Sequence, residues 1–286
     1  MEPKSWMMFR VLLNRYYGAS SEELIRSLPS KYQDNLKQTD IAAADPTPLL
    51  AQPFERVSAI HYSWLAPSVQ KLPKALQAPT IAALSLPQTQ GICRLLKLPM
   101  PSAKPVPPLR QYLLDGLFKQ ISPQERLPPA YLPSSLLNPL AGYSKTQLQR
   151  LIDLLGIRDL AQEIRLVVHK THQETILKCL TDEERKFLDF YLYKEREKLT
   201  VPRLDLKQWG GDAAKLRQQI HLRGLIRLGR ALSGQNKDLL WYILHTLDTG
   251  RAGIIEQNCN TQPLDNVANE LRRQVIGLIN YFSKNE

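Results

Sequence analysis

Cysteine is scarce in this sequence of 286 residues, and neither a secretion signal nor a membrane span is evident. The three cysteines are far apart and odd in number, which argues against a disulfide framework and favours a reducing compartment. They are Cys93, Cys179 and Cys259. The longest uncharged run, 75–93, contains prolines and glutamines and is too polar for a membrane-spanning helix. We therefore expect a cytoplasmic protein.

Strand signals are missing as well. The sequence has no convincing period-two runs and no Asn-Gly or Asp-Gly dipeptide that joins two of them. Helix signals recur instead. Ser144 with Gln147, and Thr181 with Glu184, have the spacing of capping boxes, and Gly156 is expected to end the helix that begins after Ser144. The predicted helices cover 20–28, 109–120, 144–156, 181–193 and 264–282. The last has an apolar stripe formed by Leu264, Val267, Leu271, Val275, Leu278 and Ile279. These patterns predict an all-α, multi-helix fold.

Proline is unevenly distributed and indicates where the domains divide. Ten of the 21 prolines lie between Pro99 and Pro139, and only two follow. Because proline-rich segments favour extended backbone, residues 99–143 are interpreted as a connector around one short helix. The expected organisation is an N-terminal helical domain at 1–98, this connector, and a C-terminal helical domain at 144–286.

Motifs of catalysis and cofactor binding are absent. No segment matches the signatures of a nucleophile elbow, a zinc protease, a Cys-x-x-Cys pair or a dinucleotide fold. The segment 224–230 has the glycine spacing of a phosphate loop, but its apolar interior suits an amphipathic helix better. His169, His172 and Cys179 have helical spacing but lack an evident fourth metal ligand. We expect no enzyme activity, no cofactor, no metal and no small-molecule substrate.

The segment 245–259 gathers titratable side chains, from His245 to Cys259, around a Gly-Arg-Ala sequence. A helix break is expected at Thr249–Gly250, with Arg251 starting the second helix, so His245 and Cys259 would fall on opposite sides of it. Nothing in the sequence pairs these two residues as base and nucleophile. Arg251 is a candidate for contact with a partner protein, or else a local cap.

Charge is the more informative property. The formal net charge is +11, which suits an acidic protein, a membrane surface or nucleic acid. Between Ala213 and Lys237 there are six basic side chains and no acidic one. Arg223, Arg227 and Arg230 lie on one face of a predicted helix. This face is a candidate docking site for an acidic protein; the alternatives are a solvated face or phosphate contacts.

Two aromatic residues, Tyr62 and Trp64, stand out in the segment HYSWLAPSVQKLPKALQ at 61–77. They either fill a core between short helices or form an exposed anchor at an interface.

Three segments carry a resemblance to a known family, namely LGRALSGQ at 228–235, ILHTLDTGRAGII at 243–255 and a closing proline-led turn with a long helix at 262–282. Through these segments the run at 216–257 and the tail resemble the C-terminal domain of the flagellar motor switch protein FliG. In that family an acidic pair follows the arginine that corresponds to Arg251, whereas here those positions are Asn258 and Cys259. Torque depends on charged contacts with a stator, so this loss argues against a rotating motor part.

A non-rotating relative of the flagellar switch is the sorting platform of the type III secretion injectisome. The segment HYSWL at 61–65 is similar to a region of its accessory component, the SctK family. This resemblance implies a non-catalytic adaptor without cofactor, which links the inner-membrane ring protein to the pod protein at the cytoplasmic face of the inner membrane. A flagellar switch component and a helical nucleic-acid-binding protein are the alternatives; nucleic acid is not the expected partner.

Overall fold

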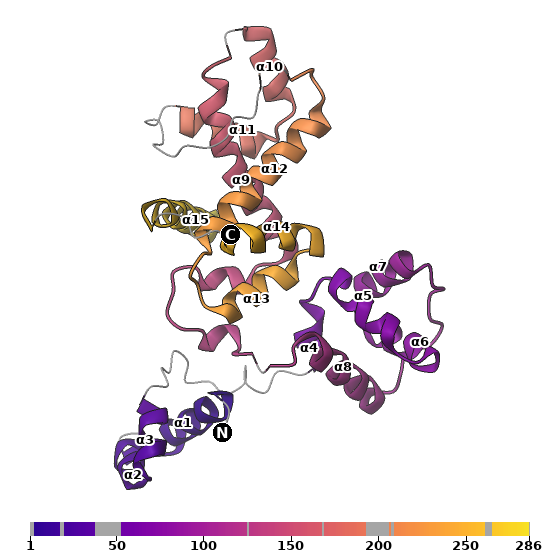
Figure 1. Ribbon diagram of the computed structural model, residues 1–286, viewed down its shortest axis with the longest axis vertical. Coiled ribbons are helices and arrows are strands. Elements are labelled where there is room, and N and C mark those ends of the chain that lie inside the picture. The colour runs from indigo at the N-terminus through magenta and orange to yellow at the C-terminus, as the bar shows by residue number, and fades with distance from the viewer. Residues whose placement is uncertain are drawn as a thin grey trace. The chain divides into compact units, whose positions relative to one another are not determined.

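The computed structural model confirms the all-α class. It describes residues 3–17, 20–37, 53–124, 126–167, 169–192, 206, 209–260 and 265–285. The regular elements of these residues are all helical (Figure 1). The first eight α-helices are α1 (Pro3–Tyr17), α2 (Ser21–Ser27), α3 (Ser30–Lys37), α4 (Pro53–Ser58), α5 (Tyr62–Lys71), α6 (Lys74–Ala83), α7 (Leu86–Leu96) and α8 (Pro107–Ile121). After the 3₁₀ helices η3 (Pro129–Tyr131) and η4 (Asn138–Gly142) come α9 (Lys145–Ile164), α10 (Lys170–Lys178), α11 (Asp182–Leu192), α12 (Ala213–Ala231), α13 (Lys237–Thr246), α14 (Thr249–Asn260) and α15 (Asp265–Asn285).

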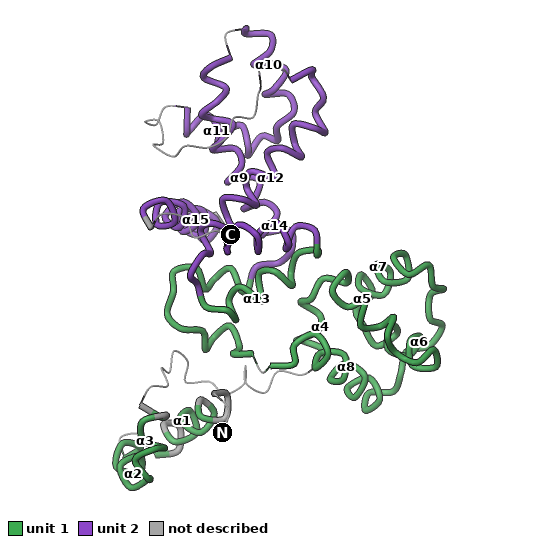
Figure 2. The backbone as a smooth tube through the Cα atoms, in the orientation of Figure 1, with its two compact units in different colours: residues 1–142, 236–249 green, residues 143–235, 250–286 purple. Residues whose placement is uncertain are grey.

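The chain forms two compact units, and neither is continuous in sequence. Unit 1 contains 1–142 and 236–249, and unit 2 contains 143–235 and 250–286 (Figure 2). This division differs from the expected one, because α13 belongs with the first 142 residues rather than with the C-terminal part.

Helices α1 to α3 have a small core of their own. Trp6 and Leu13 of α1 pack with Ile25 of α2 and Leu36 of α3. The Arg10 guanidinium donates to the Leu36 carbonyl at 2.8 Å, which satisfies one of the unpaired carbonyl groups near the end of α3.

The main core of unit 1 is built by α4 to α8 together with Trp241 of α13. Here the expected connector differs from the structure. Helix α8 is not a spacer, because its buried Leu114 and Leu117 belong to this core. Gln88 of α7 supports the same core, since its side-chain amide donates to the carbonyls of Val57 and Ile60 at 2.8 and 2.7 Å. Pro107 and Pro108 lie in the first turn of α8, so these two prolines begin a packed helix rather than an extended linker.

The core of unit 2 contains a close crossing of α9 and α12. A Cβ added at Gly156 would lie 2.8 Å from the carbonyl carbon of Ile220, and one added at Gly224 would lie 2.6 Å from that of Ile152. Only glycine permits this approach of two backbones. The expectation that Gly156 ends a helix was therefore wrong: α9 runs through it to Ile164.

The predicted capping boxes are confirmed. Ser144 and Gln147 cap α9, and the Thr181 N–H donates to Glu184 at 2.7 Å before α11. Other predicted helices correspond to α2, α8 and α15, but Leu264 and Tyr193 lie outside the described residues. No helix of the described residues is both long and apolar enough to cross a membrane.

Candidate interaction site

Two segments that are far apart in sequence, 61–64 and 245–249, meet within unit 1. The His61 N–H donates to the His245 carbonyl at 2.7 Å, and the Trp64 indole N–H donates to the Leu247 carbonyl at 2.9 Å. The Thr249 N–H donates to the Ser63 hydroxyl at 3.1 Å. Helix α13 ends at Thr246 and α14 begins at Thr249, so these bonds satisfy backbone groups that helix ends leave unpaired. We call this contact the junction.

The position of the break corrects an expectation. It lies at Leu247–Asp248, two residues earlier than expected, and Arg251 falls in the first turn of α14. The junction explains the position, because both carbonyls that the 61–64 segment caps belong to the last residues of α13 and its C-cap.

An imidazole stacked between two indoles forms the centre of the junction. The ring of His245 lies 4.3 Å from that of Trp64 and 4.2 Å from that of Trp241, both in stacked geometry. Burial lowers the pKa of His245 to about 4, against a hydrogen bond to the Trp241 carbonyl that raises it, and the charge of Arg126 lowers it further. His245 is therefore neutral at physiological pH and acts as a packing group.

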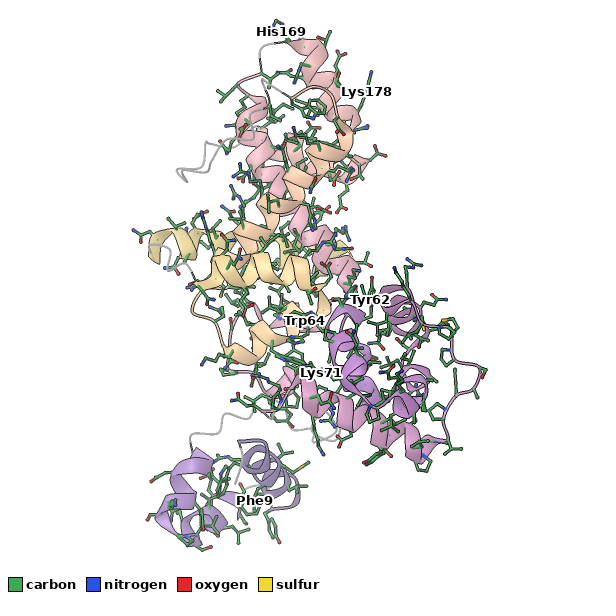
Figure 3. All side chains as sticks on the ribbon, turned by 45° about the vertical axis from the view of Figure 1, so that its right-hand side comes forward. Phe9, Tyr62, Trp64, Lys71, His169 and Lys178 are labelled. Atoms are coloured by element: carbon green, nitrogen blue, oxygen red, sulfur yellow. The ribbon has the colours of Figure 1, made fainter. Side chains whose placement is uncertain are left out.

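Tyr62 and Trp64 are not exposed anchors. Both are partly buried and pack against the core of α4 to α8 (Figure 3). A Cβ at Gly91 of α7 would lie 2.7 Å from Cε1 of Tyr62, so this ring lies directly on the α7 backbone. The structure therefore agrees with the interpretation that Tyr62 and Trp64 fill a core between short helices.

The arginine face predicted on α12 does not form a continuous surface. Arg227 is only 3% exposed. Its Nε donates to the Asp159 carboxylate at 2.8 Å, and its Nη1 donates to Gln274. A buried guanidinium is stable only with such partners, so Arg227 holds α12 against α9 and α15 and is not available to an acidic protein.

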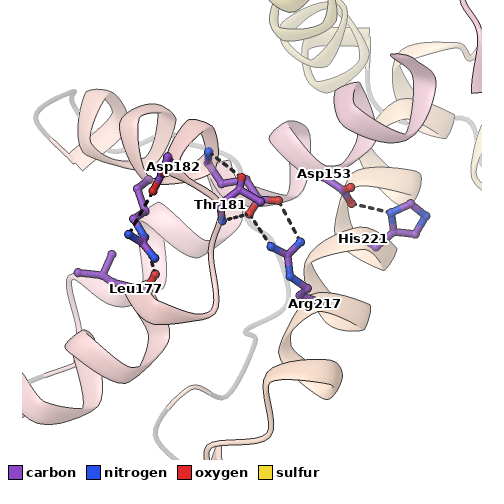
Figure 4. A network of polar contacts seen from close by, with 8 residues as sticks. Asp153, Leu177, Thr181, Asp182, Arg217 and His221 are labelled. Atoms are coloured by element: carbon purple, nitrogen blue, oxygen red, sulfur yellow. Dashed lines mark hydrogen bonds and ion pairs between the residues drawn. The ribbon is translucent and has the colours of Figure 1, made fainter. Parts of the chain in front are cut away.

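The neighbouring arginines of α12 are also engaged or partly covered. Arg217 forms an ion pair with Glu184 at 3.0 Å (Figure 4). Arg223 and Arg230 are partly buried. Two arginines of the acid-free segment 213–237 thus pair with acids of α9 and α11 within unit 2.

Arg251 also has internal partners. Its Nε donates to His221 Nε2 at 2.8 Å, and His221 Nδ1 lies 2.6 Å from Asp153 (Figure 4). A guanidinium can only donate, so in this network the neutral ring of His221 accepts at Nε2 and donates from Nδ1. Arg251 thereby joins α14 to α12 and α9 within unit 2. The structure agrees with a local role for it.

The other groups considered for chemistry lie apart or are blocked. His169 and Cys179 flank α10 at opposite ends, and the described residues contain no cluster of metal-ligating side chains. The segment 224–230 is the interior of α12. Burial, and next the charge of Glu256, raises the pKa of Cys259, and burial raises that of Cys93. Both thiols therefore remain protonated near neutral pH and are poor nucleophiles.

The exposed basic surface lies elsewhere, in a part of unit 1 that the sequence patterns did not single out. Between Arg56 and Leu114 all seven charged side chains are basic. Five of them are exposed, namely Lys71, Lys74, Arg94, Lys97 and Lys104. The long stretch without acidic residues is the sequence signal of this surface, whereas the helical spacing of arginines does not reveal it.

Comparison with protein-family models, with curated proteins and with solved structures gave no match.

Proposed function

We propose that this protein is a non-catalytic adaptor of a type III secretion sorting platform, of the SctK type. The junction is the observation that supports it most. The two segments that carry the separate resemblances, HYSWL at 61–65 and the part of ILHTLDTGRAGII up to Thr249, are hydrogen-bonded to each other. A joint origin of both resemblances in one protein family accounts for this pairing better than two chance similarities do.

The all-helical body suits an adaptor. Each unit has its own buried core, so each can present a stable surface to a different neighbour. On this proposal one neighbour is the inner-membrane ring protein and the other is the pod protein. The chain would then reside in the cytoplasm, at the inner face of the membrane, through protein contacts alone.

The state of the reactive side chains favours a scaffold over an enzyme. His245 is held neutral between two indoles, and Cys93 and Cys259 are buried with raised pKa. A general base needs a pKa near the working pH, and a thiol nucleophile needs a lowered one. Neither condition is met by these groups.

The flagellar switch alternative requires an exposed acidic pair after Arg251, and the side chains there are of another kind. The Asn258 amide donates back to the Ile254 carbonyl at 2.8 Å, and Cys259 is buried. Position 259 therefore packs inside unit 2, so even an acidic side chain there would not face a stator.

The proposal is tested by crosslinked affinity purification of the tagged full-length protein from its own host, with a high-salt wash. Cells that carry the untagged protein provide the background. Recovery of the secretion-ring and pod proteins is the expected result. Recovery of flagellar stator or switch proteins instead would replace it with the flagellar alternative. Recovery of nucleic acid that is lost as salt rises would replace it with a nucleic-acid-binding role.

A further inference from the structure

Most of the net charge of the protein resides in one part of unit 1. Residues 56–114 contain Arg56, Lys71, Lys74, Arg94, Lys97, Lys104 and Arg110 and no acidic residue, which gives 7 − 0 = +7 of the total +11. Two of the seven are used internally. Arg56 pairs with Asp115 at 3.4 Å, and Arg110 donates to the Ala83 carbonyl at 2.9 Å and covers the ring of Phe54. None of the other five pairs with a carboxylate among the described residues.

Three of these five cations belong to one continuous stretch, from the end of α7 through the proline turns into α8. Large apolar side chains alternate with them and are exposed to solvent. Tyr112, at 76%, is the most exposed of them. The stretch, which we call the 94–112 surface, consists of the cations Arg94, Lys97 and Lys104 and the apolar residues Leu95, Met100, Val106, Leu109 and Tyr112. Cations mixed with exposed apolar side chains are typical of an interaction surface rather than of a merely solvated one.

The backbone of the 94–112 surface is held in place before any partner arrives. Lys97 adopts a left-handed conformation that ends α7, and the Leu98 N–H donates back to the Cys93 carbonyl at 2.9 Å. The Cys93 thiol lies 3.5 Å from the Pro99 carbonyl. Five prolines between Pro99 and Pro108 restrict the backbone further. A surface ordered in this way loses little conformational entropy on binding.

We propose that the 94–112 surface docks a protein face on which carboxylates surround an apolar centre. The identity of that partner rests on the proposed function, which makes it one neighbour of the adaptor, the ring protein or the pod protein. Charge complementarity selects acidic partners, and the apolar side chains select protein over nucleic acid, which would leave Leu95, Met100 and Val106 without contacts. Pro99, Pro101 and Pro105 interrupt the stretch, so its apolar side chains do not lie on one amphipathic helix. A membrane surface is therefore a less suitable partner than a protein.

The test uses purified full-length chain and, as probes, the purified cytoplasmic domain of the ring protein and the purified pod protein. The charge variant is Arg94→Glu, Lys97→Asp and Lys104→Glu together; Asp is chosen at 97 because it tolerates the left-handed conformation. A second variant, Leu95→Ser with Tyr112→Ser, removes apolar contacts at exposed positions. The matched control reverses three exposed lysines of unit 2: Lys170→Glu, Lys186→Glu and Lys215→Glu.

The charge variant is expected to bind one of the two probes about tenfold more weakly or worse, chiefly through a slower association rate and with a smaller dependence on salt. The serine variant is expected to dissociate faster from the same probe, and the control to bind like wild type. If both probes bind the charge variant as they bind wild type, the inference is overturned while the adaptor function stands.

If neither probe binds wild type, the proposed function fails, and a second measurement decides the inference. A photo-crosslinking residue at position 112 in host cells then identifies the neighbour. An acidic protein that, once purified, loses affinity for the charge variant supports the inference. Crosslinks to lipid or nucleic acid overturn it, as does charge-dependent binding to phosphatidylglycerol vesicles or duplex DNA in place of protein, or no crosslink at all.

Discussion

Arg227 of α12 and Asp159 of α9, 68 residues apart in sequence, form an ion pair in the core of unit 2. Both side chains are almost wholly buried, and Gln274 of α15 accepts a further hydrogen bond from the guanidinium. Three helices thus meet at one charged group. The pair is more informative about where α12 sits than about which partner the protein binds.

Removing one member of this pair is expected to leave an uncompensated charge in the core. Arg227→Met should lower the free energy of unfolding by about 3–5 kcal/mol, because the Asp159 carboxylate would lose its partner. Urea denaturation measures this loss. The double variant Arg227→Met with Asp159→Leu should recover part of it, and Arg223→Met, on the same helix but partly exposed, should cost about 1 kcal/mol or less. A loss at Arg227 no larger than at Arg223 would contradict the assignment.

Substitution of glycine by alanine is expected to have opposite effects on stability at the crossing of α9 and α12 and in α15. Gly224→Ala should destabilise unit 2 by about 1–3 kcal/mol, because the new Cβ would clash with the Ile152 backbone. That backbone is part of α9 and can shift only together with the helix. Gly277→Ala in α15, where nothing lies within 4 Å, should instead stabilise by about 0.5–1 kcal/mol through helix propensity. Thermal unfolding of the two variants compares them directly. Stabilisation of both variants would mean that α9 and α12 lie further apart than in this structure.

The all-α class, the capping boxes and most helix positions could be predicted from the sequence because they depend on local spacing. Ser144 with Gln147 shows this, since both partners of the bond lie within one turn. Gly156 shows the limit: the same residue type ends a helix or permits a close crossing, and the choice depends on Ile220, more than sixty residues away. The prediction that Arg227 lies on an exposed face was wrong for the same reason, because its partner Asp159 lies in another helix. Residues 61–64 and 245–249 likewise lie far apart in sequence, and only the fold brings them together.

The junction predicts a specific cost for losing one hydrogen bond. Trp64→Phe keeps an aromatic ring beside His245 but leaves the Leu247 carbonyl without its donor. A buried acceptor without a partner costs about 1–3 kcal/mol, and the smaller ring adds a packing loss. Trp209→Phe, in unit 2, provides a comparison in which the indole bond spans only three residues, to the Asp212 carbonyl. Local opening of 245–249, read by amide hydrogen exchange, should increase for Trp64→Phe alone. Equal protection in both variants would argue against the junction.

The cysteines should differ in reactivity in the folded protein. Cys93 and Cys259 are buried with raised pKa, whereas Cys179 is partly exposed at the end of α10. Alkylation by iodoacetamide near neutral pH, followed by peptide mapping, should therefore label Cys179 first. In denaturant the three should react at similar rates, which provides the control. Early labelling of Cys259 in the native protein would show that α14 opens readily or is packed differently.

The pH dependence of stability should carry a contribution from His245. Its pKa is about 4 in the folded protein and near 6.5 in the unfolded chain, so the unfolded state takes up a proton first as pH falls. The stability that the neutral ring provides is fully present above about pH 6.5 and is lost progressively as pH falls towards 4. The quantity to measure is the difference between wild type and His245→Gln, which isolates the contribution of this one ring. That difference in melting temperature should shrink from pH 7 to pH 5, because glutamine does not titrate. A difference that stays constant across the range would mean that the His245 ring is protonated without cost, and that it is not held between Trp64 and Trp241.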